Sequence, residues 1–137
     1  MTNYRLEKGD HYAQTNSEKW PYRVKRRLYF LHPTLEGIEA KHHLFSIKNG
    51  CITVEPGYHW NGCNGVKDTE QNLRFSLFHD VGYQCLQQNL IKRSFKNRLT
   101  FDRLAKIITK EDGMSVFESH VYFYVLRVFG LFFAYRK

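Results

Sequence analysis

Residues 43–57, HLFSIKNGCITVEPG, contain the clearest fold signal in the chain. Asn49-Gly50 is the pair preferred in a two-residue type I′ turn, because both positions take a positive φ. A turn at this pair places apolar residues opposite one another on one face, Ile47 with Ile52 and Phe45 with Val54. Pro56-Gly57 then ends the second strand. The segment predicts an antiparallel β-hairpin with one buried face.

Upstream of the hairpin, the segment YRVKRRLYFL at residues 22–31 mixes apolar and basic residues in partial alternation. This pattern is typical of an edge strand. Residues 1–20 are polar and irregular, and we expect them to form an arm outside a single domain of residues 21–137.

Downstream, the spacing changes to that of helices. Apolar residues recur at every fourth position and predict a helix over residues 73–86 with one buried stripe. The residues of this stripe are Leu73, Leu77, Val81 and Cys85. A second helix is expected from about Thr100, whose hydroxyl can cap it. Its inward residues are predicted to be Phe101, Leu104, Ala105 and Ile108.

A third helix is predicted from Ser115, because Glu118 three residues later completes a capping box. Residues 121–135 are nearly all apolar, but they are shorter than the roughly 20 residues that a spanning helix needs. The default interpretation is a helix buried in the core, and the alternative is docking on a membrane face. The fold class expected is α+β: an N-terminal antiparallel hairpin or small sheet packed on about three helices, the first two antiparallel.

The composition favours anionic partners. Lys and Arg number 21 against 13 acidic residues, which gives a net charge of +8. Nucleic acid, phosphate headgroups and acidic proteins all fit this balance, as does a soluble surface without a partner. Two runs of the sequence mix basic residues with aromatic residues. Their basic residues include Arg26, Arg27, Lys92, Arg93, Lys96 and Arg98.

Three cysteines are too few for a disulfide framework, and the N-terminal residues have no apolar stretch typical of a secretory signal. We therefore expect a reducing location, inside a cell or within a particle assembled there.

Polar side chains interrupt the apolar run FSLFHDVGYQC at residues 75–85. On a helical wheel Ser76, His79, Asp80 and Tyr83 gather opposite the buried stripe. They are either a solvated helix face or a reaction centre. Asp102 on the next helix could orient His79 across a short helical hairpin, or it could only complement the helix dipole.

A metal site is the second element of this hypothesis. Gly62 and Gly65 allow backbone carbonyl groups of the preceding loop to turn toward a hard cation, and Asp80 could supply a carboxylate. These residues therefore indicate a site for a hard cation. His79 would take a proton from water while the metal stabilises the oxyanion.

The motif HDVGY at residues 79–83 resembles the active-site helix of phospholipase A2, in particular its small bacterial and fungal branch. The resemblance implies that His79 is the general base, that Asp80 binds calcium and that Asp102 orients the histidine. It also implies that carbonyl groups of the loop, at Trp60, Gly62 and Gly65, complete the calcium site, and that Tyr83 bonds an active-site aspartate. Ser76 departs from the family, which has a cysteine there.

A longer resemblance covers residues 52–130. VEPGYHWNGCNGV, FHDVGY, RLTFD and YVLRVFG follow one another as in domain of unknown function 1353, a family of small phage and bacterial proteins. This family implies a phage context without an established reaction. We therefore expect a phage-type protein with a possible calcium-dependent lipid ester hydrolase site. The alternatives are a non-catalytic phage accessory, virion or anti-defence protein, and a basic module that binds nucleic acid or nucleotide.

Overall fold

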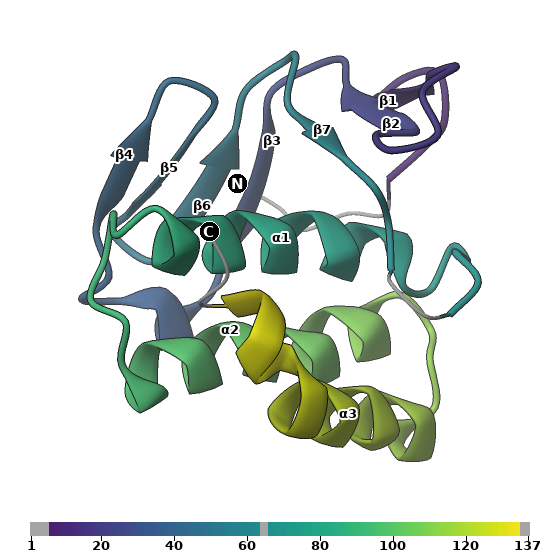
Figure 1. Cartoon of the computed structure of the whole chain (residues 1–137). Coiled ribbons are helices and arrows are strands. Elements are labelled where there is room, and N and C mark those ends of the chain that lie inside the picture. The colour runs from purple at the N-terminus through teal and green to yellow at the C-terminus, as the bar shows by residue number, and fades with distance from the viewer. Residues whose placement is uncertain (1–5, 64–65, 135–137) are drawn as a thin grey trace. The chain divides into compact units, whose positions relative to one another are not determined.

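A computed structural model describes residues 6–63 and 66–134, without the side chains of residues 131–134. The chain divides into two compact units, Met1–Asp68 and Thr69–Lys137, and each is described by itself. Within the described residues, the first unit holds seven β-strands and the second holds three α-helices (Figure 1). The fold is α+β, as predicted.

The hairpin belongs to a four-stranded antiparallel sheet with the order β3-β6-β5-β4. Its strands are β3 (Leu28–Leu31), β4 (Ala40–His42), β5 (Phe45–Lys48) and β6 (Cys51–Val54). Both turn residues have a positive φ, 53° at Asn49 and 75° at Gly50. Ile47 pairs with Ile52, and Phe45 pairs with Val54. All four are buried, so the predicted register and its apolar face are confirmed.

A second, three-stranded sheet has the order β1-β2-β7, with β1 at Tyr12–Gln14, β2 at Tyr22–Val24 and β7 at His59–Trp60. The single edge strand predicted over residues 22–31 is therefore wrong. Residues 25–27 are three consecutive basic residues with exposed side chains, and they separate β2 from β3. Only β3 lies at the edge of its sheet, whereas β2 is the central strand of the other. The division into a polar arm and a single domain stays a prediction, although β1 lies within residues 1–20.

The helices are α1 (Leu73–Gln87), α2 (Phe95–Glu111) and α3 (Val116–Ala134). The apolar positions predicted for α1 and α2 are all buried. Thr100 does not cap α2, because the helix begins one and a half turns earlier. Ser94 is the cap, and its side chain accepts a hydrogen bond from the backbone N–H of Asn97. At α3, the Ser115 hydroxyl accepts the backbone N–H of Glu118, one half of the predicted capping box.

Helices α1 and α2 run antiparallel, side by side (Figure 1). Buried Arg74, at the start of α1, bonds Asp112 just beyond the end of α2, with 3.0 Å from Nε to Oδ2. His79, farther along α1, contacts Asp102 in the middle of α2. An ion pair thus joins the two helices at one level, and a hydrogen bond joins them at the other.

Helix α3 corrects the expectation of a helix buried in the core. Val121, Tyr124 and Val128 are 45%, 63% and 66% exposed, although this part of the sequence is nearly all apolar. None of the helices in the described part of the chain is long and apolar enough to cross a bilayer.

Candidate functional site

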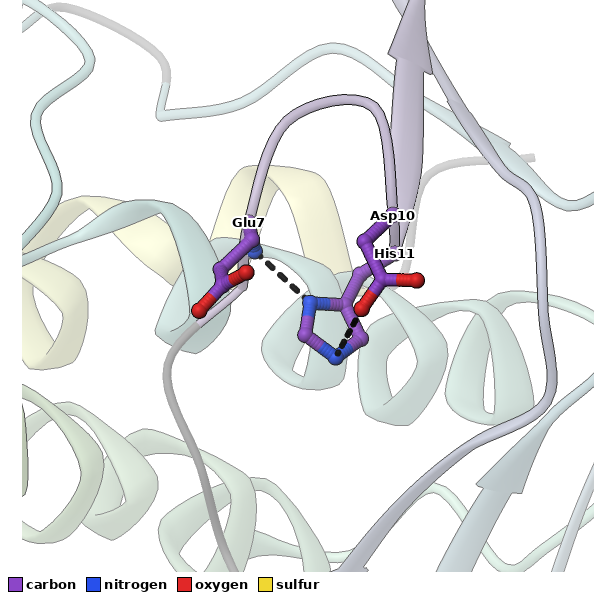
Figure 2. Close-up of side chains that lie close together, drawn as sticks. All are labelled: Glu7, Asp10 and His11. Carbon is purple, nitrogen blue, oxygen red and sulfur yellow. Dashed lines mark hydrogen bonds and ion pairs between the residues drawn. The ribbon is translucent and has the colours of Figure 1, made fainter.

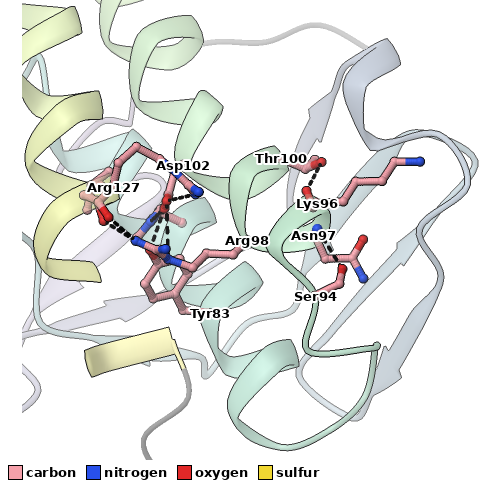
Figure 3. Close-up of polar contacts among 10 residues, drawn as sticks. Tyr83, Ser94, Lys96, Asn97, Arg98, Thr100, Asp102 and Arg127 are labelled. Atoms are coloured by element: carbon pink, nitrogen blue, oxygen red, sulfur yellow. Dashed lines mark hydrogen bonds and ion pairs between the residues drawn. The ribbon is translucent and has the colours of Figure 1, made fainter. Parts of the chain in front are cut away.

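Asp102 lies at the centre of a polar cluster to which all three helices contribute (Figure 3). Its side chain is fully buried. Oδ1 accepts the Tyr83 hydroxyl at 2.5 Å and lies 3.0 Å from Nε2 of His79. Oδ2 accepts a hydrogen bond from Arg127 of α3 at 2.8 Å. We name His79, Tyr83, Arg98, Asp102 and Arg127 the Asp102 cluster.

Arg98 supplies the second positive charge of the cluster. Its Nε lies 3.7 Å from Oδ2 of Asp102, one helical turn away. Its Nη2 donates to the backbone carbonyl groups of Leu126 and Arg127, at 2.8 and 2.7 Å. Arg98 therefore ties α2 to the backbone of α3. Two guanidinium groups face one carboxylate, so the cluster carries a net positive charge when His79 is neutral.

These partners control the ionisation of Asp102. Burial acts to raise the pKa of its carboxyl group, but hydrogen bonds from His79, Tyr83 and Arg127 outweigh burial and hold the pKa below its usual range. Asp102 is thus a carboxylate at neutral pH. Burial and the adjacent Asp102 charge raise the pKa of Tyr83 well above that of a free tyrosine, so its hydroxyl stays protonated and donates.

The hydrogen bonds also determine the tautomer of His79. An ionised carboxylate only accepts hydrogen bonds, so Nε2 of His79 must carry the proton that faces Asp102. In a neutral ring this leaves the lone pair on Nδ1. Nδ1 has no hydrogen-bond partner among the described residues. The ring lies between those of Phe75 and Tyr83, with centroid distances of 5.2 and 4.0 Å. The arrangement can therefore present an oriented base at Nδ1.

Two glycines allow the helices to approach closely enough to build the cluster. A Cβ atom on Gly82 of α1 would lie 2.2 Å from the ring of Phe101 on α2. A Cβ atom on Gly130 of α3 would lie 2.3 Å from the hydroxyl oxygen of Tyr83. Any side chain at these positions would force the helices or the aromatic rings apart. The glycine of the HDVGY motif is thus explained by packing against α2.

The structure brings together His79, Tyr83 and Asp102, and their catalytic roles stay predictions. The solvated-face interpretation of the α1 arc is wrong, because Ser76, His79 and Tyr83 are only 3%, 6% and 5% exposed. Asp102 does not lie in the first turn of α2, because that helix begins at Phe95. The helix dipole therefore does not account for Asp102.

The sequence analysis did not predict that Arg98 and Arg127 would pair with Asp102. Arg98 stood among the basic residues assigned to a solvated or nucleic-acid-binding face, yet it is only 5% exposed. A sequence signal existed for each of them. Arg98 precedes Asp102 by four residues on one helix, and Arg127 is an isolated charge in an apolar segment.

The proposed calcium ligands are distributed over both units. Trp60 is fully buried in the first unit, where its ring packs on Tyr12 and Tyr22 at 5.8 and 5.2 Å. Asp80 belongs to α1 of the second unit and is partly exposed. Gly65 lies outside the described residues. The calcium site stays a prediction.

Asp68 organises the glycine loop, which the sequence did not reveal. Its carboxylate accepts the Tyr22 hydroxyl at 2.6 Å and the Cys63 backbone N–H at 2.8 Å. Gly62, with a φ of 76°, lies so close that an added Cβ would be 2.4 Å from either carboxylate oxygen. Burial and the hydrogen bond to Asp68 raise the pKa of Tyr22. The first glycine of the loop is therefore required by contact with Asp68.

A second group of possible metal ligands comprises Glu7, Asp10 and His11 (Figure 2). Nδ1 of His11 accepts the backbone N–H of Glu7 at 2.8 Å, so in a neutral ring Nε2 carries the proton. Asp10 bonds Arg26 through both oxygens, at 2.9 and 3.0 Å. Neither histidine nitrogen offers a lone pair to a cation, and this group carries no metal assignment.

No family model, curated protein or solved structure matches the chain. The resemblances to phospholipase A2 and to domain of unknown function 1353 therefore stay predictions.

Proposed function

We propose that this protein is an ester hydrolase in which Nδ1 of His79 is the general base. The observation that carries the proposal is the hydrogen bond from Nε2 of His79 to buried Asp102. This bond assigns the proton to Nε2 and leaves a lone pair on Nδ1. An oriented, neutral imidazole backed by a carboxylate is the arrangement that general base catalysis needs.

In the proposed reaction, Nδ1 takes a proton from a water molecule as the water oxygen attacks the ester carbonyl carbon. The imidazolium ion that forms is stabilised by Asp102 through Nε2. The proton then passes from Nδ1 to the departing alkoxide when the tetrahedral intermediate breaks down. Tyr83 and Arg127 are positioning residues, because they hold the two oxygens of Asp102 and do not contact the reacting atoms in this scheme.

The substrate class proposed is a phospholipid ester, supported by the net charge of +8 and by the HDVGY motif. Asp80 would contribute a carboxylate ligand to calcium, and carboxylate oxygens are the hard donors that this ion prefers. When bound, calcium would polarise the ester carbonyl.

The experiment measures fatty-acid release from mixed anionic and zwitterionic phospholipid, with calcium or with chelator. The test variant is His79→Gln, because the glutamine amide can still donate to Asp102 but cannot act as a base. We expect release to fall about 100-fold or more, the usual contribution of general base catalysis, at little cost in thermal stability. Folded wild-type protein that releases no fatty acid, or equal release by His79→Gln, would overturn the proposal.

Asp80→Asn separates calcium binding from base catalysis. We expect this variant to lose the calcium dependence of release while keeping the Asp102 cluster, because Asp80 is not part of that cluster. Release that depends equally on calcium in Asp80→Asn and in wild type would contradict the calcium assignment.

A second candidate is a non-catalytic phage accessory protein of the host cytoplasm or virion. It is favoured by the low exposure of His79 and by the two arginines that neutralise Asp102. In this alternative the Asp102 cluster only joins the three helices. It predicts that His79→Gln phage retain the wild-type phenotype, whereas the hydrolase proposal predicts loss of function in a folded protein.

A further inference from the structure

The solvent side of α2 carries basic residues along one line. Lys96, Arg103 and Lys110 recur at intervals of seven residues, and all three side chains are exposed. At 100° and 1.5 Å per residue they lie within an arc of about 40° and extend over about 21 Å. The side chain of Lys96 points away from the Asp102 cluster (Figure 3). We name these three residues the α2 basic stripe.

Acidic neighbours do not compensate the charges of the stripe. Residues three and four positions apart are neighbours on a helix, and a solvated face commonly pairs opposite charges at this spacing. None of the positions three or four residues from a member of the stripe is acidic. Glu111 is exposed at the end of α2, but it bonds Arg74 at 2.6 Å. In the part of the chain that the structure describes, no acidic side chain pairs with the stripe.

The stripe is also unfavourable for its own helix. Lys96 lies in the first turn of α2, where the positive end of the helix dipole disfavours a cation, and that turn contains no acidic residue. Lys106 adds a like charge three residues from Arg103 and four from Lys110. Only Lys110, in the last turn, is favourably placed with respect to the dipole. A polyanion bound along the stripe would relieve this repulsion.

An exposed aromatic ring lies at the beginning of the stripe. Phe95 is the first residue of α2, next to Lys96, and it is 70% exposed. The guanidinium group of Arg127 lies 4.6 Å from the centroid of this ring. Cations along one line and an exposed aromatic ring are the two features with which proteins bind single-stranded nucleic acid, because the cations contact phosphates and a base stacks on the ring.

The surface of α2 is less suited to a membrane. In a helix that lies on a bilayer, basic residues flank an apolar face that enters the acyl chains. On α2 this order is reversed, because the basic stripe forms the centre of the exposed side. Phe95 is the only large apolar residue exposed on α2, all of which lies in the described part of the chain.

We propose that the α2 basic stripe binds the phosphate backbone of a single-stranded nucleic acid, with Phe95 stacking on one of its bases. Contacts of this kind position the strand and carry no sequence information. This function goes beyond the proposed hydrolysis and does not depend on it, because the stripe shares no residue with the Asp102 cluster.

The experiment measures the fluorescence anisotropy of a labelled thymidine oligonucleotide of about 16 nucleotides, the upper site size of comparable modules. Each phosphate contact on a single strand contributes about −0.7 to the slope of log affinity against log salt concentration, so three contacts predict a slope of about −2 for wild type. Arg103→Gln should reduce this slope to about −1.4. It should weaken binding about eightfold at about 0.05 M salt, the factor that one such contact gains between 1 M and that concentration.

Arg23→Gln is the matched control, because Arg23 is also exposed but lies in the first unit, and its loss changes the net charge equally. This control should bind as wild type does. Phe95→Leu should weaken binding at least fivefold without changing the salt slope, because stacking on a base is not ionic. His79→Gln should bind as wild type does, because His79 belongs to the buried cluster.

The assignment of the stripe is overturned if wild type does not bind the oligonucleotide, if its affinity does not change with salt, or if Arg103→Gln binds as tightly as Arg23→Gln. Full affinity in Phe95→Leu would overturn the stacking and with it the preference for a single strand. Wild type is also tested on phosphatidylserine vesicles. Binding to these vesicles that Arg103→Gln weakens, without binding to the oligonucleotide, would assign the stripe to a membrane instead.

Discussion

Asp102→Asn is the sharpest test of the cluster, because it removes one charge while keeping the size of the side chain. In the wild type, Oδ1 faces two donors, His79 and Tyr83, and Oδ2 faces Arg127. The asparagine amide has one oxygen and one NH₂ group. With the NH₂ group in the place of Oδ2 it meets Arg127, which cannot accept a hydrogen bond, and in the place of Oδ1 it requires His79 and Tyr83 to accept instead of donating.

The substitution also leaves Arg98 and Arg127 without their carboxylate. Their side chains are only 6% and 14% exposed. Removing one partner of a buried ion pair typically costs about 3–5 kcal/mol. We expect Asp102→Asn to lower the free energy of unfolding by about 3 kcal/mol, near the lower end because the amide still accepts one hydrogen bond.

The pH dependence provides a second readout. The pKa of Asp102 is lowered in the folded state, so its contribution is complete above the unfolded value of about 3.9. That contribution is lost as the pH falls through the lower folded value. The difference in stability between wild type and Asp102→Asn should therefore be constant near neutral pH and shrink below about pH 4.

Urea unfolding followed by circular dichroism, repeated from neutral to acidic pH, measures both effects. Asp10→Asn is the matched control, because Asp10 pairs with Arg26 at a site where both side chains are more than half exposed. That surface pair should be worth less than about 1 kcal/mol. The reasoning is refuted if Asp102→Asn costs no more than Asp10→Asn, or if the stability difference is the same in acid.

The remaining predictions concern close packing and burial. Gly130→Ala should lower the free energy of unfolding by about 1–3 kcal/mol, because its Cβ would strike the Tyr83 hydroxyl. In a double-mutant cycle with Tyr83→Phe, the cost of Gly130→Ala should be smaller because that hydroxyl is gone, and additive effects of the two substitutions would contradict the contact. Gly50→Ala should lower the free energy of unfolding by about 1–2 kcal/mol, because φ at this position is 75° and alanine is strained there. An unchanged midpoint in thermal or urea unfolding would contradict this reasoning. Burial raises the pKa of the Cys85 thiol to about 12. Mass spectrometry should therefore detect no alkylation of Cys85 at neutral pH until denaturant is added. Rapid alkylation of Cys85 in the native protein would show that this part of α1 opens.

Local sequence was a good guide wherever neighbouring residues determine the structure. The Asn49-Gly50 pair predicted the hairpin and its register because a two-residue turn admits few backbone conformations. The buried stripe of α1 followed from its four-residue spacing. The prediction was wrong at the start of α2, where Thr100 was predicted as the cap and Ser94 is the cap. Both hydroxyls can cap a helix, and spacing does not distinguish them.

The sequence by itself determined the elements of the second unit and the presence of His79, Tyr83 and Asp102 on two adjacent helices. Only the tertiary structure decided that Asp102 also pairs with Arg127, because that contact requires a third helix at a distance set by Gly82 and Gly130. It also decided that an apolar stretch of α3 stays exposed. Composition reports how apolar a helix is, whereas the side that is covered depends on which neighbours are there to pack against it.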